Sequence, residues 1–362
     1  METVIDKQVL ILEGHRFDKK RILETHPESM GDKNFIALFY FMHEWFNDSP
    51  TLNVHTSGST GDPKEITVEK ERMINSAIAT CSFLKLKPGD TALLCMSLDF
   101  IGGKMMVVRA LVAGLSLIVT EPCGHPLKDI YFPCTFAAMV PLQVYNTLQN
   151  PGERWLLGQI KHTLIGGGAI DTKIVNSLQD LHCQFWSTYG MTETLSHIAL
   201  RALNGKDASP YYKPFADVKL SLSEEETLII DAPKICSEPI HTNDIAELND
   251  SGFFKIIGRK DNIINSGGIK IQIEEVENKI RSVMRQPYAI TSIPDTKFGE
   301  IIVLLLQNRD NVPTEIEIKT TLKKVVPSYW QPKRIIYVPE IPKTDNGKIN
   351  RAEAKILAME RS

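Results

Sequence analysis

The sequence predicts an α/β protein with two domains and a small β subdomain. From about residue 69 to residue 187, β-like runs alternate with helical patterns, which is typical of a largely parallel sheet. From about residue 212, short β-like runs follow one another, and roughly the last hundred residues form a separate α+β pattern. A chain of 362 residues is long for one domain. We therefore expect an N-terminal domain over 1–260, with the β subdomain at about 212–260, and a C-terminal domain over 261–362.

Composition and charge indicate a cytoplasmic globular protein. The chain is 43% hydrophobic and 23% charged, and its formal net charge of −3 gives no electrostatic reason to expect binding to nucleic acid or to an anionic membrane. The N-terminus has no signal-peptide core, and no apolar run approaches the roughly 20 residues that span a bilayer. The 6 cysteines are scattered and form no CxxC pair, so we expect reduced thiols and neither disulfides nor a zinc site.

The individual elements follow from the spacing of apolar residues. In the N-terminal domain we expect strands at 9–12, 91–97, 116–120, 136–140, 162–165 and 184–187, and helices at 20–24, 33–46, 69–84, 102–113, 143–148 and 172–178. The β subdomain has candidate strands at 218–222, 227–230, 245–248 and 253–257. In the C-terminal domain we expect helices at 273–283 and 314–325 and strands at 288–293, 301–307 and 334–337.

The segment from residue 56 to residue 64 has the composition of a phosphate-binding loop. It reads Thr56, Ser57, Gly58, Ser59, Thr60, Gly61, Asp62, Pro63 and Lys64. Glycines leave amide N–H groups uncovered for phosphate oxygens, hydroxyls add donors and the lysine adds a positive charge. The segment is not a Walker A loop, because that motif needs a Gly-Lys-Ser/Thr sequence that opens a helix. Both this segment and the glycine run at 166–168 are expected at the carboxyl ends of parallel strands, where one shared pocket would form.

Seven short segments in a fixed order resemble the adenylate-forming superfamily, which includes acyl-CoA synthetases, aryl-CoA ligases, luciferases and peptide-synthetase adenylation domains. The segments are 56–64, 166–170, Tyr-Gly-Met-Thr-Glu at 189–193, Thr-Asn-Asp at 242–244, Gly-Arg-Lys-Asp at 258–261, Ser-Gly-Gly at 266–268 and the run from Pro342 to Arg351. The resemblance extends from about residue 52 to residue 351. It implies the adenylate-forming fold, with a mobile C-terminal domain, and an ATP-dependent acid–thiol ligase that uses ATP, Mg²⁺ and coenzyme A.

The resemblance also assigns residues to ATP and magnesium. It places phosphate contacts on the segment 56–64 and on Thr192, and magnesium on Glu193 and Thr60, because carboxylate and hydroxyl oxygens suit that ion. The nucleoside contacts that it implies are Gly167, Gly168, Ala169, Tyr189, Gly190, Asp244 and Arg259. An exposed glycine backbone and an aromatic ring can hold an adenine, and a carboxylate can accept both ribose hydroxyls.

Lys348 is the residue that the resemblance makes the main catalytic group. A cation that contacts both the carboxylate and the α-phosphate lowers the barrier to their reaction. The implied mechanism has two half-reactions, which are formation of acyl-AMP and pyrophosphate and then transfer of the acyl group to the thiol of coenzyme A. Between them, the C-terminal domain turns about Asp261, withdraws Lys348 and presents the face formed by Ser266, Gly267 and Gly268.

Three departures from the family pattern stand out. Asn243 replaces the usual glycine of a Thr-Gly-Asp turn, and we expect the turn to survive because asparagine tolerates left-handed conformations. Phe100 replaces a histidine that is common in the family. The phosphate loop begins at residue 56, so the first subdomain is expected to be much reduced, and the acyl pocket then has a thinner wall or borrows one from a second subunit in a homodimer.

The acid substrate is expected near Phe100, Gly103, Arg109, Thr188 and His197. Arg109 lies in an otherwise apolar helix, nine positions beyond Phe100. The o-succinylbenzoate–CoA ligases of menaquinone biosynthesis resemble this chain in having a basic residue at the corresponding position, where a diacid needs a cation for its second carboxylate. Alternatively, Arg109 only covers the edge of a helix, and His197 is a histidine of the core or the surface.

Three hypotheses about function stay open at this stage. The first is an acid–CoA ligase whose substrate is o-succinylbenzoate. The second is a CoA ligase for another aryl or fatty acid, which a neutral and apolar pocket around Arg109 would favour. The third is a non-catalytic nucleotide-binding regulatory homologue, against which the presence of Lys348, Glu193 and Asp244 argues.

Overall fold

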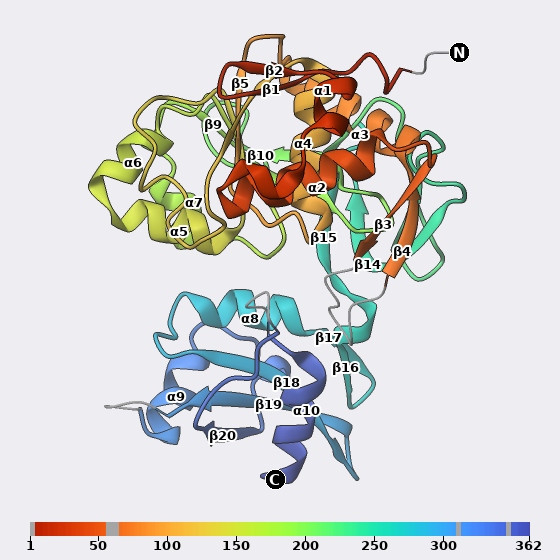
Figure 1. The fold of residues 1–362 in the computed structure, drawn as a ribbon. Coiled ribbons are helices and arrows are strands. Elements are labelled where there is room, and N and C mark those ends of the chain that lie inside the picture. The colour runs from red at the N-terminus through yellow and green to blue at the C-terminus, as the bar shows by residue number, and fades with distance from the viewer. Residues whose placement is uncertain (1–3, 56–64, 309–312, 345–348) are drawn as a thin grey trace.

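A nine-stranded mixed sheet forms the centre of the first part of the chain (Figure 1). The computed structural model describes residues 4–55, 65–308, 313–344 and 349–362. The strand order is β11-β10-β9-β8-β7-β5-β6-β1-β2. The five neighbouring pairs in the middle, from β9–β8 to β6–β1, are parallel, and the pairs β11–β10, β10–β9 and β1–β2 at the edges are antiparallel. The strands are β1 Leu10–Leu12, β2 His15–Phe17, β5 Thr91–Leu94, β6 Ser116–Val119, β7 Phe136–Met139, β8 His162–Ile165, β9 Gln184–Gly190, β10 His197–Ala202 and β11 Lys213–Pro214. The expected parallel sheet is confirmed for its middle.

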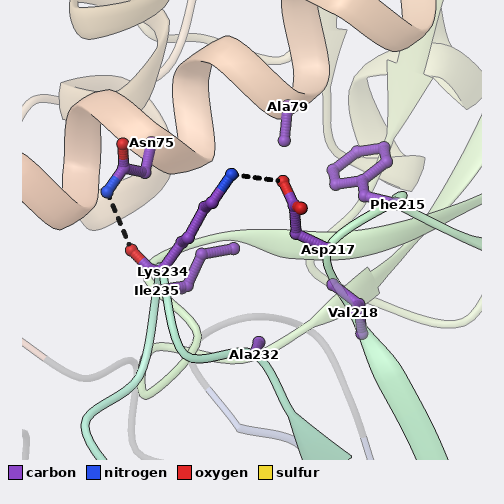
Figure 2. Close-up of a pocket in the computed structure, with 8 residues that line it drawn as sticks. All are labelled: Asn75, Ala79, Phe215, Asp217, Val218, Ala232, Lys234 and Ile235. Atoms are coloured by element: carbon purple, nitrogen blue, oxygen red, sulfur yellow. Dashed lines mark hydrogen bonds and ion pairs between the residues drawn. The ribbon is translucent and has the colours of Figure 1, made fainter.

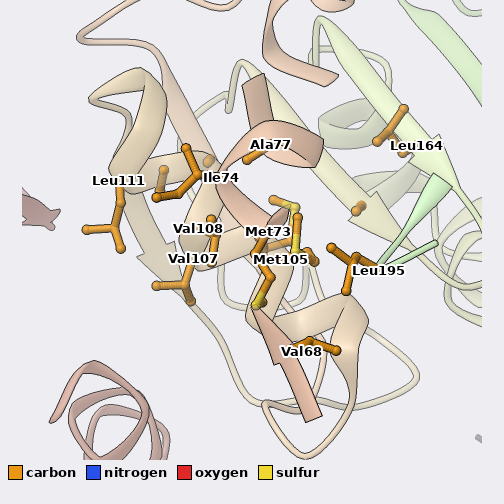
Figure 3. Close-up of a cluster of buried hydrophobic side chains, with 14 of the residues drawn as sticks. Val68, Met73, Ile74, Ala77, Met105, Val107, Val108, Leu111, Leu164 and Leu195 are labelled. Carbon is orange, nitrogen blue, oxygen red and sulfur yellow. The ribbon is translucent and has the colours of Figure 1, made fainter. Parts of the chain in front are cut away.

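Helices cover both faces of this sheet, because its buried strands are apolar on both sides. The helices are α1 Lys19–Glu24, α2 Lys33–Phe46, α3 Lys70–Leu84, α4 Ile101–Ala113, α5 Pro141–Gln149, α6 Pro151–Leu157 and α7 Thr172–Ser177, with a 3₁₀ turn, η1, at Pro27–Met30. Successive residues of β5 face opposite cores: Leu94 belongs to the core that contains buried residues of α2, α3 and α4, and Leu93 belongs to the core that contains buried residues of α5, α6 and α7. Figure 3 shows the first core, in which Met73 and Ala77 of α3 lie close to Met105 and Val108 of α4.

Two antiparallel sheets accompany the large one. A two-stranded hairpin of β3 Thr51–His55 and β4 Glu65–Glu69 pairs in register from Thr51↔Glu69 to His55↔Glu65. A four-stranded sheet has the order β12-β13-β14-β15 and consists of Lys219–Leu222, Thr227–Asp231, Ile240–Leu248 and Phe254–Arg259. These four strands correspond to those predicted for the β subdomain, although β14 begins at Ile240, five residues before its predicted start at Ile245.

The last part of the chain has a sheet of its own, and Figure 1 shows it as a second body below the first. Its order is β17-β16-β19-β18, with β20 on the free side of β19. The elements are β16 Ile263–Ser266, β17 Ile269–Gln272, α8 Ile273–Arg281, β18 Tyr288–Asp295, β19 Gly299–Gln307, α9 Glu315–Leu322, β20 Arg334–Val338 and α10 Arg351–Glu360, with 3₁₀ turns η2 at Lys260–Asn262 and η3 at Ser328–Trp330. The predicted boundary between residues 260 and 261 falls within η2 and stays a prediction.

Several predictions about elements were wrong. The strand expected to end at residue 187 continues to Gly190, and the antiparallel strands β10 and β11 follow it. Helix α6 was missed, although Asn150 caps it and Pro151 is its first residue. Helix α5 ends at Gln149, so a single residue separates the two helices. Helix α10 and the hairpin of β16 and β17 were missed as well. The segment 56–64 joins the two strands of the β3–β4 hairpin and does not follow a strand of the parallel sheet.

No helix among the described ranges is both long enough and apolar enough to cross a membrane.

Candidate active site

Part of the predicted site lies outside the described residues. These positions are Thr56, Ser57, Gly58, Ser59, Thr60, Gly61, Lys64 and Lys348. The remaining predicted residues lie in four places: the ends of β8 and β9 with the turn to β10, strands β14 and β15 with η2, helix α4, and the hairpin of β16 and β17.

Tyr189, Asp244 and Arg259 form one hydrogen-bonded cluster. Asp244 on β14 lies directly opposite Arg259 on β15 in the ladder. The Tyr189 hydroxyl donates to Asp244 Oδ2 at 2.6 Å, and Arg259 Nη1 lies 3.5 Å from Asp244 Oδ1. Burial and the negative charge of Asp244 raise the pKa of Tyr189 above its usual range, so the phenol stays a hydrogen-bond donor. A carboxylate offers about four lone-pair directions, so Asp244 keeps acceptor capacity for two further hydroxyls.

Two aromatic side chains that the sequence reasoning did not include pack around Tyr189. The ring of Phe254 meets it edge-on at 4.9 Å between centroids, and the ring of Tyr212 lies 5.8 Å away. Phe254 and Tyr212 themselves stack at 5.4 Å. The ring of Tyr189 is thus fixed by its contacts with the rings of Phe254 and Tyr212 and by Asp244 at its hydroxyl. No sequence signal distinguishes Phe254 from the other apolar residues of its strand.

The glycine segment 166–169 lies beside the end of β9. It follows β8 directly, and a side chain at Gly166 would meet Thr188 Oγ1 at 2.3 Å. Gly167 has a φ of +80°, which favours glycine, and both Gly167 and Ala169 are exposed. Gly190 closes β9 where β10 passes so near that a Cβ would lie 2.2 Å from the Ser196 carbonyl oxygen. The predicted residues of the glycine segment and of β9 therefore lie together at the carboxyl ends of β8 and β9.

Thr192 and Glu193 lie in the turn that connects β9 with β10. Thr194 stabilises this turn, since its hydroxyl accepts from Met191 N at 2.9 Å and donates to Ser196 O at 2.6 Å. Glu193 is exposed, so its carboxylate is available to a cation, whereas its carbonyl accepts from Cys236 Sγ at 3.5 Å. Among the residues that the structure describes, no three His, Cys, Asp or Glu side chains gather into a metal site. A magnesium ion that binds with a nucleotide needs only one or two protein carboxylates, which fits a single exposed Glu193.

Arg109 is the most unusual charged residue near this turn. It is only 2% exposed on α4, and its Nη2 donates to Ser196 Oγ at 2.8 Å. Its Nε is buried without a hydrogen-bond partner, and within the described ranges no carboxylate forms an ion pair with it. Burial lowers the pKa of Arg109 to about 10. The guanidinium is thus a desolvated cation with an unused donor, which is costly unless an anion joins it.

A chain of hydrogen bonds continues from Arg109 through His197. Ser196 Oγ lies 3.2 Å from His197 Nδ1, and His197 Nε2 lies 3.0 Å from Thr80 Oγ1, whose own proton goes to Ser76 O at 3.2 Å. Because Ser196 accepts from Arg109, its proton is free for His197 Nδ1, so the histidine carries its proton on Nε2. Burial and the positive charge of Arg109 lower the pKa of His197 well below its ordinary value. The structure therefore brings Arg109 and His197 together through Ser196, which the sequence reasoning missed.

Phe100 and Gly103 lie at the beginning of α4, away from this chain of hydrogen bonds. Phe100 is the residue before the helix and is 47% exposed, while Gly103 is buried in its first turn. Their predicted contact with the acid stays a prediction.

Asp261 in η2 is held by two side chains from the β subdomain. Arg259 Nη2 donates to its Oδ2 at 2.9 Å, and Asn243 Nδ2 lies 3.3 Å and 3.2 Å from its two carboxylate oxygens. The expectation of a left-handed turn at Asn243 was wrong. Asn243 lies inside strand β14 and is absent from the residues with positive φ, because pairing with β13 and β15 keeps the strand extended on both sides.

Gly267 and Gly268 form the two-residue turn between β16 and β17. Ser266 pairs with Ile269, and the two glycines have φ of +60° and +82°. A two-residue hairpin turn with positive φ at both positions strongly favours glycine, asparagine or aspartate. The backbone conformation of the turn therefore explains the Gly-Gly pair. The predicted role of Ser266, Gly267 and Gly268 toward coenzyme A stays a prediction.

Two cavities lie elsewhere. Figure 2 shows the smaller, of about 20 Å³, between α3 and residues 215–235, where Lys234 pairs with Asp217 at 3.0 Å and Asn75 donates to the Lys234 carbonyl at 3.0 Å. This volume holds about one water molecule. The larger, of about 400 Å³, is lined by Ile170, Thr172, Val175, Arg201, Ala202, Leu203, Ala208, Ser209 and Pro210. The larger cavity is lined by Ile170 of the segment 166–170, but neither cavity is lined by a residue that was predicted to contact a ligand.

Comparison with known proteins supports the resemblance that the seven segments indicated. Residues 3–233 match the AMP-binding enzyme family, and residues 275–348 match the AMP-binding enzyme C-terminal domain. A solved structure of an acyl-CoA synthetase (AMP-forming)/AMP-acid ligase II-like protein from Dyadobacter fermentans is 31% identical, with a TM-score of 0.64. The match covers 95% of this chain and 98% of that one.

More distant relatives carry names that specify a substrate. The chain is 28% identical over 319 residues to the 2-succinylbenzoate–CoA ligase of Salmonella typhimurium, a match that covers 82% of this chain and 66% of that protein. The o-succinylbenzoate CoA synthetase of Bacillus subtilis, solved with its acyl-adenylate intermediate, is 19% identical, with a TM-score of 0.71 and coverage of 84% of this chain and 68% of that chain. At this identity the second likeness shows the fold alone. The chain thus spans about two thirds of the length of these two relatives.

Proposed function

Since the chain belongs to the AMP-binding enzyme family, we propose that it is an ATP-dependent acid–CoA ligase and that its acid is a dicarboxylate, with o-succinylbenzoate as the leading candidate. The observation that carries the choice of a diacid is the buried guanidinium of Arg109, which has an unused donor and no carboxylate partner in the described part of the chain. The name of the relative from Salmonella supports the same choice.

The nucleoside of ATP would bind where Tyr189, Asp244 and Arg259 come together. The carboxylate of Asp244 accepts the ribose hydroxyls, and Tyr189, held by Phe254, offers its ring to the adenine. The exposed Gly167 and Ala169 provide a backbone surface on the other strand end. Glu193 would hold a magnesium ion with the triphosphate, and that ion, when bound, neutralises charge on the leaving pyrophosphate.

In the first half-reaction one carboxylate of the acid attacks the α-phosphorus of ATP. The bond to the bridging oxygen breaks, pyrophosphate leaves, and the acid becomes an acyl-AMP. The second carboxylate would form hydrogen bonds with Arg109, which turns the buried cation into a compensated pair. Thr192 and Lys348 would stabilise the charge that develops on the α-phosphate.

In the second half-reaction the thiol of coenzyme A attacks the acyl carbon. A thioester and AMP form, and the thiol proton is released. The C-terminal domain would turn about Asp261 between the two steps, so that Lys348 withdraws and the turn with Ser266, Gly267 and Gly268 approaches the thiol.

The experiment that tests this proposal is pyrophosphate release with MgATP and coenzyme A across a panel of acids. The panel contains o-succinylbenzoate, benzoate, a short fatty acid and a long one. Turnover with o-succinylbenzoate alone would support both the chemistry and the role of Arg109. Turnover with a different acid would keep the ligase activity and discard the substrate, and no turnover with any acid while ATP still binds would favour a nucleotide-binding protein without catalysis.

Replacing Lys348 by alanine should separate the two half-reactions. We expect acyl-AMP formation to fall by on the order of 10²–10³-fold, because the cation at the reacting phosphate is lost. Thioester formation from supplied acyl-AMP and coenzyme A should stay within about twofold of the wild-type rate. An equal loss of both half-reactions would contradict the proposed rotation of the C-terminal domain.

A further inference from the structure

The last part of the chain contains two acidic residues that each connect a proposed functional segment to helix α10. Glu277 on α8 and Glu300 on β19 lie in different parts of this domain. Their partners on α10 are Arg351 and Lys355, which are four residues apart and therefore lie on the same side of the helix.

Glu277 and Arg351 form a bidentate pair at the start of α10. Arg351 Nη1 and Nη2 donate to the two carboxylate oxygens of Glu277 at 2.7 Å and 2.6 Å, and Nη1 also donates to Ile290 O at 3.1 Å. Glu277 Oε1 accepts from Ile290 N at 3.0 Å as well. The Glu277 side chain is 9% exposed, so its carboxylate is mostly desolvated, and both of its oxygens accept hydrogen bonds.

The pair fixes the chain three residues after Lys348. On the other side of that segment, Asn350 N donates to Pro342 O at 3.0 Å, and Lys343 pairs with Ile349 as an isolated β-bridge. Asn350 also caps α10 by accepting from Glu353 N at 3.2 Å. The two ends of the segment that contains Lys348 are therefore joined to each other, and Arg351 fastens them to α8 and β18.

Glu300 fixes a different segment, the turn with Ser266, Gly267 and Gly268. Its Oε2 accepts from Asn265 N at 3.2 Å, and its Oε1 accepts from Ser292 Oγ at 2.8 Å and Lys355 Nζ at 2.9 Å. Asn265 precedes the turn directly, and Gly267 N donates to Phe298 O at 2.7 Å. Glu300 thus connects the beginning of the turn with β18 and with α10.

We propose that these two ion pairs position different segments for different half-reactions. The pair Glu277–Arg351 orients the Lys348 segment for acyl-AMP formation, and the pair Glu300–Lys355 orients the 265–268 turn for thioester formation. The inference rests on the proposed two-step ligase reaction. Neither pair touches the reacting atoms. Each acts by holding the backbone next to a segment that does, and a misplacement of about 1 Å at a reacting group costs roughly 10²-fold in rate.

Arg351→Lys and Glu300→Gln test the proposal, with both half-reactions measured for each. Acyl-AMP formation is followed as pyrophosphate release from MgATP and o-succinylbenzoate without coenzyme A, and thioester formation starts from o-succinylbenzoyl-AMP and coenzyme A. Arg351→Lys keeps the charge but loses the bidentate geometry, so we expect acyl-AMP formation to fall by on the order of 10–100-fold and thioester formation by less than about threefold. Glu300→Gln should show the opposite pattern.

The matched control is the exposed ion pair of Glu315 and Lys319 on α9 in the same domain. Lys319→Gln should change neither half-reaction, because an exposed pair four residues apart contributes little. Thermal unfolding of each variant identifies a loss of fold, and in such a case Glu277→Gln and Lys355→Gln repeat the test from the other partner of each pair.

The outcomes are distinguishable. Opposite losses in the two variants support the proposal, whereas equal losses in both half-reactions, or no loss in either, overturn it while the ligase function stands. If the wild-type protein performs neither half-reaction with o-succinylbenzoate, the proposed function fails, and the assignment of duties to the two pairs falls with it.

Discussion

At the scale of single residues, the clearest feature is a buried cation that has no negative partner among the residues that the structure describes. Arg109 has 2% of its surface exposed, and its contacts in the described chain are to a hydroxyl and to a thioether sulfur. Desolvating a guanidinium costs several kcal/mol, which an anionic ligand would offset on binding. The sequence predicted that Arg109 belongs to the acid site. Only the structure shows that, among the described residues, its buried Nε has no hydrogen-bond partner and its charge has no carboxylate partner.

Replacing Arg109 by leucine should weaken the binding of a diacid selectively. We expect the KM for o-succinylbenzoate to rise by at least about 30-fold, since a charge-assisted pair contributes about 2 kcal/mol or more, while the KM for ATP changes by less than about twofold. The matched substrate is 4-oxo-4-phenylbutanoate, which lacks the ring carboxylate and should bind the variant and the wild-type protein about equally. Equal losses for ATP and acid, with a lower melting temperature, would instead show a structural arginine.

His197 should make stability depend on pH below neutrality. Burial and the charge of Arg109 lower its pKa in the folded protein, so between that lowered value and about 6.5 the unfolded chain binds a proton that the folded chain does not. Stability from this residue is therefore complete above pH 6.5 and declines as pH falls, by up to about 1.4 kcal/mol per pH unit.

The measurement is the free energy of unfolding of the wild-type protein and of His197→Gln between pH 8 and pH 5. Glutamine keeps an N–H donor for Thr80, and the other histidines contribute equally to both proteins. The free energy of unfolding of the wild-type protein should decrease relative to that of His197→Gln as pH falls below 6.5. Parallel curves would contradict a neutral, buried His197.

At the scale of elements, strand β9 depends on one buried asparagine. Asn204 Nδ2 donates to Leu181 O at 3.1 Å and to Cys183 O at 2.8 Å, and its Oδ1 accepts from Phe185 N at 3.0 Å. Asn204 thereby ties the beginning of β9 to the loop after α7, and the far end of the same strand carries Thr188 and Tyr189. The sequence offered no sign of this role, because asparagine after a strand is common in turns.

Asn204→Ala should destabilise the protein by about 2–4 kcal/mol, since it leaves several buried backbone groups without partners. The test is the midpoint of urea unfolding. Asn176→Ala, at an exposed position on α7, is the matched control and should change stability by less than about 0.5 kcal/mol. Similar midpoints for the two variants would show that the network around Asn204 contributes little.

At the scale of the whole molecule, the link between Asn243 and Asp261 joins the β subdomain to the proposed hinge. The family pattern that this sequence resembles has glycine in place of Asn243, so this chain has a side-chain contact there that glycine cannot make. Both residues are exposed, and the hydrogen bonds of 3.2–3.3 Å are long. Breaking this contact when η2 moves therefore costs little free energy.

Asn243→Gly should therefore raise the rate of the complete reaction by about two- to fivefold if domain rotation limits it, with each isolated half-reaction unchanged within about twofold. Asn243→Asp, which places a like charge beside Asp261, should have a larger effect in the same direction. Rates of the complete reaction and of both half-reactions for the two variants check this. A change confined to one half-reaction would show that Asn243 acts on ligand binding and not on rotation.

The sequence by itself determined the alternating β and α pattern, the four strands of the β subdomain and the order of the seven segments, because spacings of 2 and 3.6 residues and short motifs are local properties. It predicted Tyr189, Asp244 and Arg259 as one site, and the structure brings them within hydrogen-bonding distance. Only the tertiary structure decided the contacts between distant positions. Arg109 meets Ser196, Asn243 meets Asp261 and Arg351 meets Glu277 through the order of strands and the packing of helices. Such pairs lie from 18 to 87 residues apart, and no local pattern fixes which side chains the sheet brings together.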